Sequence, residues 1–145
     1  MNKPEQTIIL RGPCSTFGGP EDKGVGPDEG LAMFPNGLPV ASDPRRHLFL
    51  AEKPVGIPGL ARRLDPGALY CAFRYPYHKG GVDWREWLKT NKVTIRANGL
   101  DVECQCVDWG PHESTGRVVD LSPGAARALR VKTDDAVEVV LNRGL

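Results

Sequence analysis

Two aspartates in the last third of the chain are the side chains with the clearest potential for acid–base chemistry. Asp108 opens a turn of sequence Asp-Trp-Gly-Pro at 108–111, and Asp120 stands two residues before Ser122-Pro123. Two nearby carboxylates can divide proton donation and charge stabilisation when their surroundings push their pKa values apart. Each also has a structural alternative, because an Asp in a turn or before a helix can simply accept backbone N–H bonds.

Two further side chains accompany Asp108. Trp109 lies in a loop rather than in a periodic run, where an aromatic ring beside a carboxylate can stack on a sugar, although packing at the core or rim is the commoner role of Trp. His112, with Glu113 beside it, has an ordinary pKa near 6.5 and could assist proton transfer, although it could equally be an exposed loop histidine.

Metal, cofactor and disulfide chemistry is not expected. The chain has four cysteines, and only Cys104 and Cys106 are close in sequence, in a C-x-C pattern that lacks the usual spacing of a zinc site. The glycines between 18 and 26 do not follow a strand and open a helix, as a phosphate-binding loop would. We therefore predict no metal and no cofactor, and cysteines that are free and mostly buried, with Cys104 and Cys106 on one face of a strand.

Composition limits the partners of the protein. Nineteen Lys and Arg residues balance 18 Asp and Glu, so the formal net charge is +1, which argues against nucleic-acid binding through a global basic field. No apolar run is long enough to span a membrane. The apolar run at residues 8–10 is also too short for a signal peptide, so we expect synthesis and retention in the cytosol and no membrane partner. Oligomeric state is left open.

The first half of the chain offers few regular elements. Residues 7–10 predict a short strand, which the following Gly and Pro residues interrupt. Residues 34–65 carry further interruptions and predict an irregular insertion. The 17 Gly and 13 Pro residues make a helical bundle untenable. We expect a single domain over residues 1–145, mainly β, with many turns.

The second half is more regular. The apolar run at 68–73 predicts a core strand, and Asp83 caps a short helix that carries Trp84, Trp87 and Leu88. Asn98-Gly99 between residues 92–97 and 100–107 predicts a hairpin. Residues 116–121 predict an extended piece, Ser122–Arg130 a helix with Ser122 as N-cap, and residues 136–141 a closing strand. A helix that starts beside Asp120 would favour the charged carboxylate, which argues against an acid role.

The order of these pieces resembles the double-psi β-barrel superfamily, in particular its rare-lipoprotein-A-like branch. The resemblance rests on Asp-Trp-Gly-Pro at 108–111, Gly-Arg-Val-Val-Asp-Leu-Ser at 116–122, the Ala-rich helix and the closing strand. It covers residues 92–141, and the insertion at 34–65 has no counterpart. The pattern also looks like small proteins encoded in phages and prophage regions. The resemblance implies a six-stranded double-psi β-barrel with one or two short helices and a long irregular N-terminal and insert region.

The resemblance also implies roles for individual residues. Related barrels include lytic transglycosylases, endoglucanases and the non-hydrolytic expansins, and in the glycan-active branches the Asp before the barrel helix protonates the glycosidic oxygen. That role falls on Asp120, with Asp108 assisting. Glu29 stands where the branch has a Gly-Glu pair, which makes it a third candidate catalytic carboxylate. Arg117 in the Gly-Arg stretch is a candidate substrate-binding residue, together with Trp109 and His112.

Two functions therefore stay open at this point. One is an enzyme that cleaves or remodels a cell-wall glycan such as peptidoglycan, by lytic transglycosylase or glycosidase-like chemistry. The other is a non-catalytic module that binds glycan or serves as a phage or prophage structural accessory. A phage-encoded protein could be released from the cytosol or carried in the virion without a signal peptide.

Overall fold

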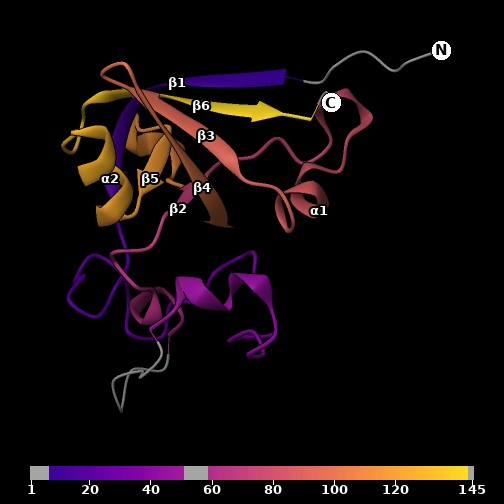
Figure 1. Ribbon diagram of the computed structural model, residues 1–145, viewed down its shortest axis with the longest axis vertical. Coiled ribbons are helices and arrows are strands. Elements are labelled where there is room, and N and C mark those ends of the chain that lie inside the picture. The colour runs from indigo at the N-terminus through magenta and orange to yellow at the C-terminus, as the bar shows by residue number, and fades with distance from the viewer. Residues whose placement is uncertain (1–6, 51–58, 144–145) are drawn as a thin grey trace.

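Six strands close into a barrel in the computed structural model, which describes residues 7–50 and 59–143 (Figure 1). Around the barrel the order is β1-β5-β2-β4-β3-β6, with β1–β5 and β2–β4 parallel and the other neighbours antiparallel. The bounds are β1 Thr7–Thr16, β2 Tyr70–Phe73, β3 Val93–Ala97, β4 Leu100–Asp108, β5 Val119–Leu121 and β6 Ala136–Asn142. The predicted mainly β, closed six-stranded architecture with two short helices is confirmed.

Strand β1 is longer than the sequence predicts, because Gly12 and Pro13 do not end it. Gly12 has a φ of 155°, and a Cβ there would come 2.6 Å from Cγ1 of Val118. The strand pairs with β6 as far as Pro13 and with β5 from Cys14 onward. Pro13 has no N–H to donate, but its carbonyl accepts the Val118 N–H at 2.9 Å. The expectation of a strand confined to residues 7–10 is therefore wrong.

The predicted hairpin is present at Asn98-Gly99. Both turn residues have positive φ, 55° and 72°, as a two-residue turn of type I′ requires. The turn joins β3 to β4 with Ala97 opposite Leu100. The Asn98 side chain donates to the carbonyl of Leu129 at 2.8 Å and so ties the turn to the end of α2.

Both predicted helices form with the predicted caps. Helix α1 spans Trp84–Leu88, and the Asp83 carboxylate accepts the Glu86 N–H. Helix α2 spans Pro123–Leu129, and Ser122 Oγ accepts the Ala125 N–H at 3.0 Å. Helix α2 packs against β4 and β5. Within the described ranges, no helix is long and apolar enough to cross a membrane.

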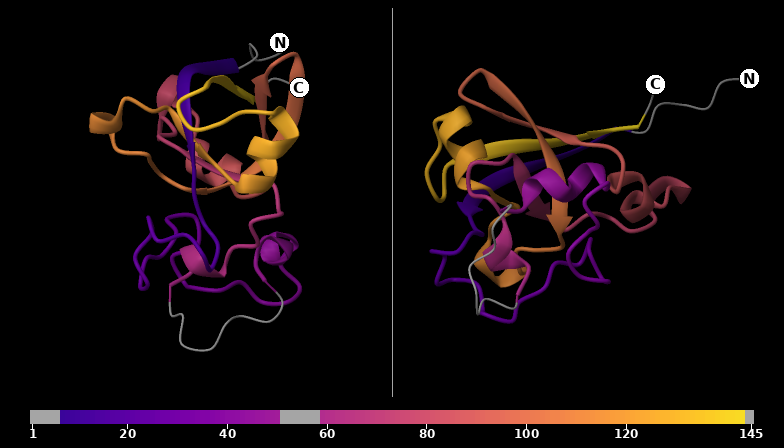
Figure 2. Two further views of the ribbon diagram at one scale, coloured as in Figure 1. Left: turned by 90° about the vertical axis from the view of Figure 1, so that its left-hand side faces the viewer. Right: turned by 60° about the horizontal axis from the view of Figure 1, so that its bottom comes forward.

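The described parts of the chain between β1 and β2 lie below the barrel in Figure 1 and in the left-hand view of Figure 2. They contain two 3₁₀ helices, Pro44–Leu48 and Ala61–Arg63, and a bridge between Phe49 and Leu64. Residues 51–58 of the predicted insertion lie outside the described residues. Apolar side chains from this region are buried in the same core as the barrel interior: Leu31, Met33, Phe34, Leu48, Phe49, Leu60 and Leu64. The barrel and the irregular region therefore share one core.

Candidate functional site

Asp108 and Asp120 are placed by three neighbouring strands. Ala72 on β2 pairs with Asp120 on β5 and with Asp108 on β4, and Ser15 on β1 pairs with Asp120 on its other side. Two strand spacings of roughly 4.8 Å put the Cα atoms of the aspartates roughly 10 Å apart. The four residues form a row across β1, β5, β2 and β4, and all four line one cleft.

A β-bulge brings Asp108 into this row. Cys71 pairs with Cys106 but the next residue, Ala72, pairs with Asp108, so β4 contains one extra residue, Val107. Because side chains alternate between the two faces of a strand, the extra residue moves Asp108 from the face of Cys106 to the face of Ala72. The bulge therefore turns a carboxylate away from the barrel interior and into the cleft.

The cleft has a volume of about 410 Å³ and lies between the barrel wall and the loops that follow β1 and β4. All six residues selected from the sequence line it: Glu29, Asp108, Trp109, His112, Arg117 and Asp120. Residues separated by up to 91 positions thus meet in one place. The volume is that of an ordinary small-ligand site.

Asp120 is the most perturbed carboxyl group of the cleft. Its pKa is raised to about 6, chiefly by burial and further by the charges of Asp108, Asp22 and Glu29, while Arg117 acts in the opposite direction. Within the described part of the chain its carboxylate accepts no hydrogen bond. The side chain is therefore poised between its charged and neutral forms near pH 6.

This environment corrects the expectation from the helix dipole. The start of α2 was expected to favour the charged form of Asp120. The first two N–H groups of α2 do not bind Asp120: that of Gly124 donates to the Pro66 carbonyl and that of Ala125 to Ser122 Oγ. Burial is the largest influence on the pKa of Asp120 and raises it. The alternative of a turn-holding carboxylate finds no hydrogen bond to support it among the described residues.

Asp108 lines the cleft and also accepts a hydrogen bond that holds a loop in position. Its Oδ1 accepts the Ala32 N–H at 2.8 Å, which links the loop after β1 to the end of β4. Burial raises the pKa of Asp108, whereas the backbone N–H groups of Ala32 and Trp109 lower it. These N–H groups favour its charged form, so Asp108 is better suited to remain a carboxylate than Asp120.

The loop after β4 carries an exposed ring and an imidazole at the cleft. Trp109 is 39% exposed, and its indole N–H donates to the Tyr75 carbonyl at 3.3 Å. His112 is exposed, and its Nδ1 accepts the Ser114 N–H at 3.1 Å, capping the short 3₁₀ helix Glu113–Thr115. That bond leaves Nε2 available to a ligand. Arg74 secures the loop by donating to the carbonyls of Pro111 and Arg117.

Arg117 and Glu29 are the remaining two residues of the predicted site. The Arg117 guanidinium binds Asp134, with Nε 2.9 Å from Oδ1, and its charge still reaches Asp120. Glu29 is exposed, and its backbone carbonyl accepts the Ala61 N–H at 3.1 Å. Glu29 therefore contributes negative charge to the cleft from a loop rather than from the barrel wall.

Sequence reasoning missed Asp22, Ser15 and Thr16, which also line the cleft. Asp22 accepts the N–H groups of Gly18 and Gly24 at 2.7 and 2.8 Å and so shapes the loop after β1. The available signal was an Asp surrounded by glycines, which is the pattern of an Asx turn. Ser15 and Thr16 were hidden because the strand was predicted to end before them.

The four cysteines take no part in the cleft. All are buried with free thiols, in agreement with the sequence-based prediction, and Cys104 and Cys106 are separated by one residue along β4. Burial raises the pKa of Cys14, Cys71 and Cys106. In the described ranges no group of three or more His, Cys, Asp or Glu residues is arranged to hold a metal ion.

Comparison with known proteins adds no relative. No family model matches the chain, and no curated protein matches its sequence.

Proposed function

We propose that this chain is a double-psi β-barrel of the rare-lipoprotein-A-like kind and that its cleft cleaves a cell-wall glycan, peptidoglycan in the first instance. The observation that carries the proposal is the pKa of Asp120, raised to about 6, in a cleft that Asp108 shares. Glycan cleavage needs one carboxyl group that is protonated near neutral pH and one that stays charged. The closed six-stranded barrel and α2 directly after Asp-Leu-Ser support the family assignment.

In the proposed reaction Asp120 acts as general acid. Its proton passes to the glycosidic oxygen while the bond between that oxygen and the anomeric carbon breaks, and positive charge develops on the sugar ring. Asp108 stabilises that charge and accepts the proton of the attacking hydroxyl, which belongs either to water or to the sugar itself. Glu29 adds negative charge to the cleft and helps to keep Asp120 protonated.

Three other side chains would hold the substrate. The exposed Trp109 ring offers a surface on which a sugar can stack. Arg117 and His112 present donors at the cleft, and Arg117 is suited to an acidic group on the substrate. The spacing of roughly 10 Å between the Cα atoms of the two aspartates leaves room for a sugar and for the attacking hydroxyl.

A second candidate function is glycan binding without cleavage, as in a phage or prophage accessory module. The hydrogen bond from Ala32 to Asp108 favours it, because this contact gives Asp108 a structural reason to be where it is. In this alternative Trp109 and Arg117 hold the glycan and Asp120 only contributes polarity. Release from the cell or incorporation in a virion would bring either protein to the wall.

The deciding experiment incubates purified protein with peptidoglycan sacculi between about pH 4 and 8 and measures soluble muropeptides. Asp120→Asn should reduce release by roughly 100-fold or more, because Asn cannot donate the proton, whereas Asp108→Asn should reduce it less. Asp101→Asn, on the exposed strand residue that faces Arg96, is the matched control and should behave as the parent.

The chemistry of the released muropeptides and the binding of the protein to sacculi distinguish the possible outcomes. Non-reducing anhydro ends would identify the sugar hydroxyl as the attacking group, and reducing ends would identify water. If the unmodified protein releases nothing from several kinds of sacculus but co-sediments with them, the catalytic proposal is wrong and the binding module replaces it. If it neither cleaves nor binds, both fail.

A further inference from the structure

A turn in the loop after β1 lies against the end of β4, where Asp108 enters the cleft. The turn spans residues 31–34, and the Phe34 N–H donates to the Leu31 carbonyl at 2.9 Å. Its two central residues are Ala32, which is exposed, and Met33, which is buried. Leu31 and Phe34 are buried as well. Three side chains therefore anchor the turn in the core, while the backbone of Ala32 stays near the surface.

The N–H groups of the two central residues hold the bulge in β4. The Ala32 N–H donates to Asp108 Oδ1 at 2.8 Å, and the Met33 N–H donates to the Val107 carbonyl at 3.2 Å. Val107 is the extra residue that moves Asp108 to the face of the cleft. The turn therefore contacts both the backbone that forms the bulge and the carboxylate that the bulge places in the cleft.

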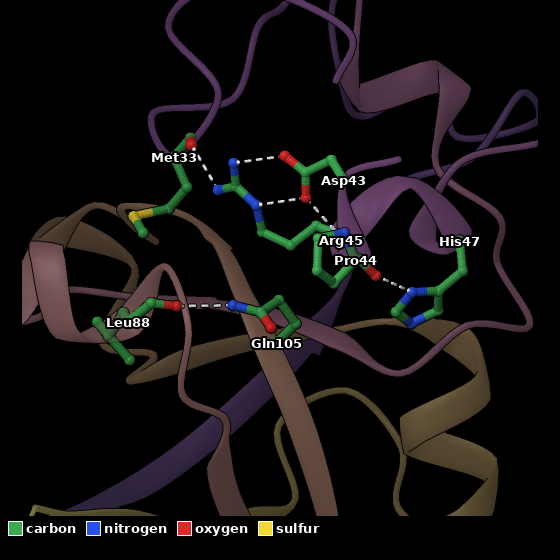
Figure 3. A network of polar contacts seen from close by, with 7 residues as sticks. All are labelled: Met33, Asp43, Pro44, Arg45, His47, Leu88 and Gln105. Carbon is green, nitrogen blue, oxygen red and sulfur yellow. Dashed lines mark hydrogen bonds and ion pairs between the residues drawn. The ribbon is translucent and has the colours of Figure 1, made fainter. Parts of the chain in front are cut away.

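The carbonyls of the same two residues accept hydrogen bonds from two arginines. Arg45 Nη1 donates to the Met33 carbonyl at 3.2 Å (Figure 3). Arg85 Nη2, on α1, donates to the Ala32 carbonyl at 2.8 Å. All four backbone polar groups at the centre of the turn are thus bonded, the two N–H groups to β4 and the two carbonyls to guanidinium groups.

The two arginines differ in what else they hold. Arg45 also binds Asp43, with Nη2 3.1 Å from Oδ2 (Figure 3), and its Cζ lies 4.3 Å from the centroid of the Phe34 ring. Replacing Arg45 would therefore disturb the packing of the whole loop. Arg85 is half-buried, and its hydrogen bond to Ala32 lies at the surface. This contact can therefore be removed without opening the core.

Arg85 binds Ala32 although a buried hydroxyl lies near its guanidinium. Tyr75 is buried, and its Oη has no hydrogen-bond partner among the described residues. Burial has the largest effect on the pKa of Tyr75 and raises it, whereas the nearby Arg85 lowers it. The hydrogen bond of Arg85 nevertheless goes to the Ala32 carbonyl. A hydrogen bond from a charged donor is stronger than one from a neutral donor, so this contact is suited to fixing the turn.

We propose that Arg85 is a positioning residue of the cleft: through the 31–34 turn it holds the bulge in β4 and keeps the Asp108 carboxylate turned into the cleft. Arg85 is not one of the described residues that line the cleft, so it acts on a ligand only through Asp108. The part that Asp108 plays in cleavage rests on the function proposed above, whereas the contacts of Arg85 with the turn do not. Separate measurements therefore test the two.

The first measurement is amide hydrogen exchange, which depends on no activity. Arg85→Gln removes the charged donor and should speed exchange of the Ala32 and Met33 amides about 5-fold, while the amides of β3 and β6 keep their rates. Lys89→Gln is the matched control, because Lys89 lies at the end of the same helix but binds Glu86; it should change neither amide. Arg85→Lys keeps the charge and a single donor, so its rates should lie between those of the parent and Arg85→Gln. It carries the test if Arg85→Gln fails to fold.

The second measurement is the pKa of Asp108, read from carboxyl ¹³C shifts across pH 3–9 and assigned with Asp108→Asn. The Ala32 N–H lowers this pKa, so Arg85→Gln should raise it. Among the described residues, Arg85 is not one of the charges that act on this pKa directly, so the change would have to pass through Ala32. The titratable groups of the described residues that interact with Asp108 are Glu29, Cys106 and Asp120, and every variant keeps them.

The results separate the positioning role from the cleavage reaction. If sacculi are cleaved, Arg85→Gln should lower kcat about 5-fold and leave KM unchanged, because Arg85 does not contact the substrate. Unchanged exchange at Ala32, an unchanged pKa of Asp108, or an equal effect of Lys89→Gln would each overturn the positioning role, whatever the activity. Faster exchange and a raised pKa in a protein that cleaves no sacculus would support the positioning role and overturn only the proposed cleavage.

Discussion

Asp108 and Asp120 lie at matched register positions on either side of Ala72, so the two carboxylates share one face of the sheet with the methyl group of Ala72 between them. The pairing is mixed, parallel between β2 and β4 and antiparallel between β2 and β5. It brings together side chains whose surroundings differ. Asp108 accepts the Ala32 N–H, whereas the pKa of Asp120 is raised by burial first and then by neighbouring negative charges. This difference is what separates their expected protonation states.

The difference in stability between Asp120→Asn and the parent should depend on pH in a defined direction. The pKa of Asp120 is about 6 in the folded protein and about 3.9 in an unfolded chain, so the native state binds more protons between these values. Stability of the parent therefore falls as pH rises through that window, and Asn removes the effect. The full pKa difference corresponds to about 3 kcal/mol in the free energy of unfolding. Because solvent in the open cleft screens the charge, we expect an effect of roughly 1–2 kcal/mol.

Urea unfolding at pH 4 and pH 7.5 measures this. The variant should match the parent at pH 4 and exceed its free energy of unfolding at pH 7.5. A variant that is less stable at both pH values would show instead that the Asp120 carboxylate holds the turn before α2.

Arg117 should control the protonation of Asp120. Its positive charge is the one influence that lowers the pKa of Asp120, so Arg117→Gln should move that pKa above 6. Asp134→Asn is the matched control, because it removes the partner of Arg117 but keeps the guanidinium beside Asp120. It should leave the pKa unchanged or lower it.

Carboxyl ¹³C shifts of Asp-labelled protein across pH 3–9 give the pKa directly and do not depend on activity. In the cleavage assay the fall in rate at high pH should follow the same order, since the acid must be protonated. A pKa of Asp120 that does not respond to Arg117→Gln would remove Arg117 from the electrostatics of the site.

Local signals predicted those parts of the fold that depend on a few neighbouring residues. Asn98-Gly99 and Ser122-Pro123 place the hairpin and α2 correctly, because turn and cap chemistry is decided within three or four residues. The extent of β1 was missed, because residues 11–13 pair with β6 and residues 14–16 with β5, both more than 100 residues away in the sequence. Gly12 and Pro13 are ordinary strand breakers only where no such partner is present.

The sequence brought together residues that line one cleft, but it did not predict the electrostatics of that cleft. All six selected residues meet in the cleft, yet the helix-dipole argument gave the wrong sign for Asp120. Burial, and the charges of Asp22 and Glu29 on the loop after β1, act on Asp120 only through the tertiary structure.

The four thiols should be unreactive in the native protein. Cys14, Cys71, Cys104 and Cys106 are fully buried, and burial raises the pKa of Cys71 and Cys106, so little thiolate is available to react. A thiol reagent at pH 8 should modify none before unfolding and all four in urea. The intact mass without reductant should equal the reduced mass, and a loss of two hydrogens mapped to Cys104 and Cys106 would contradict this.

Gly124 should tolerate no side chain, although it lies in the first turn of a helix where Ala is ordinarily the better residue. A Cβ at Gly124 would come 2.7 Å from the carbonyl oxygen of Gly67, and the Gly124 N–H donates to Pro66 at 2.8 Å, so backbone meets backbone there. Gly124→Ala should lower the free energy of unfolding by roughly 1–3 kcal/mol. Gly30→Ala is the matched control, because its Cβ would meet no atom within 4 Å, and it should be neutral or slightly stabilising. Urea unfolding of both variants checks the pair, and equal stabilities would mean that α2 can move away from the 66–67 segment without cost.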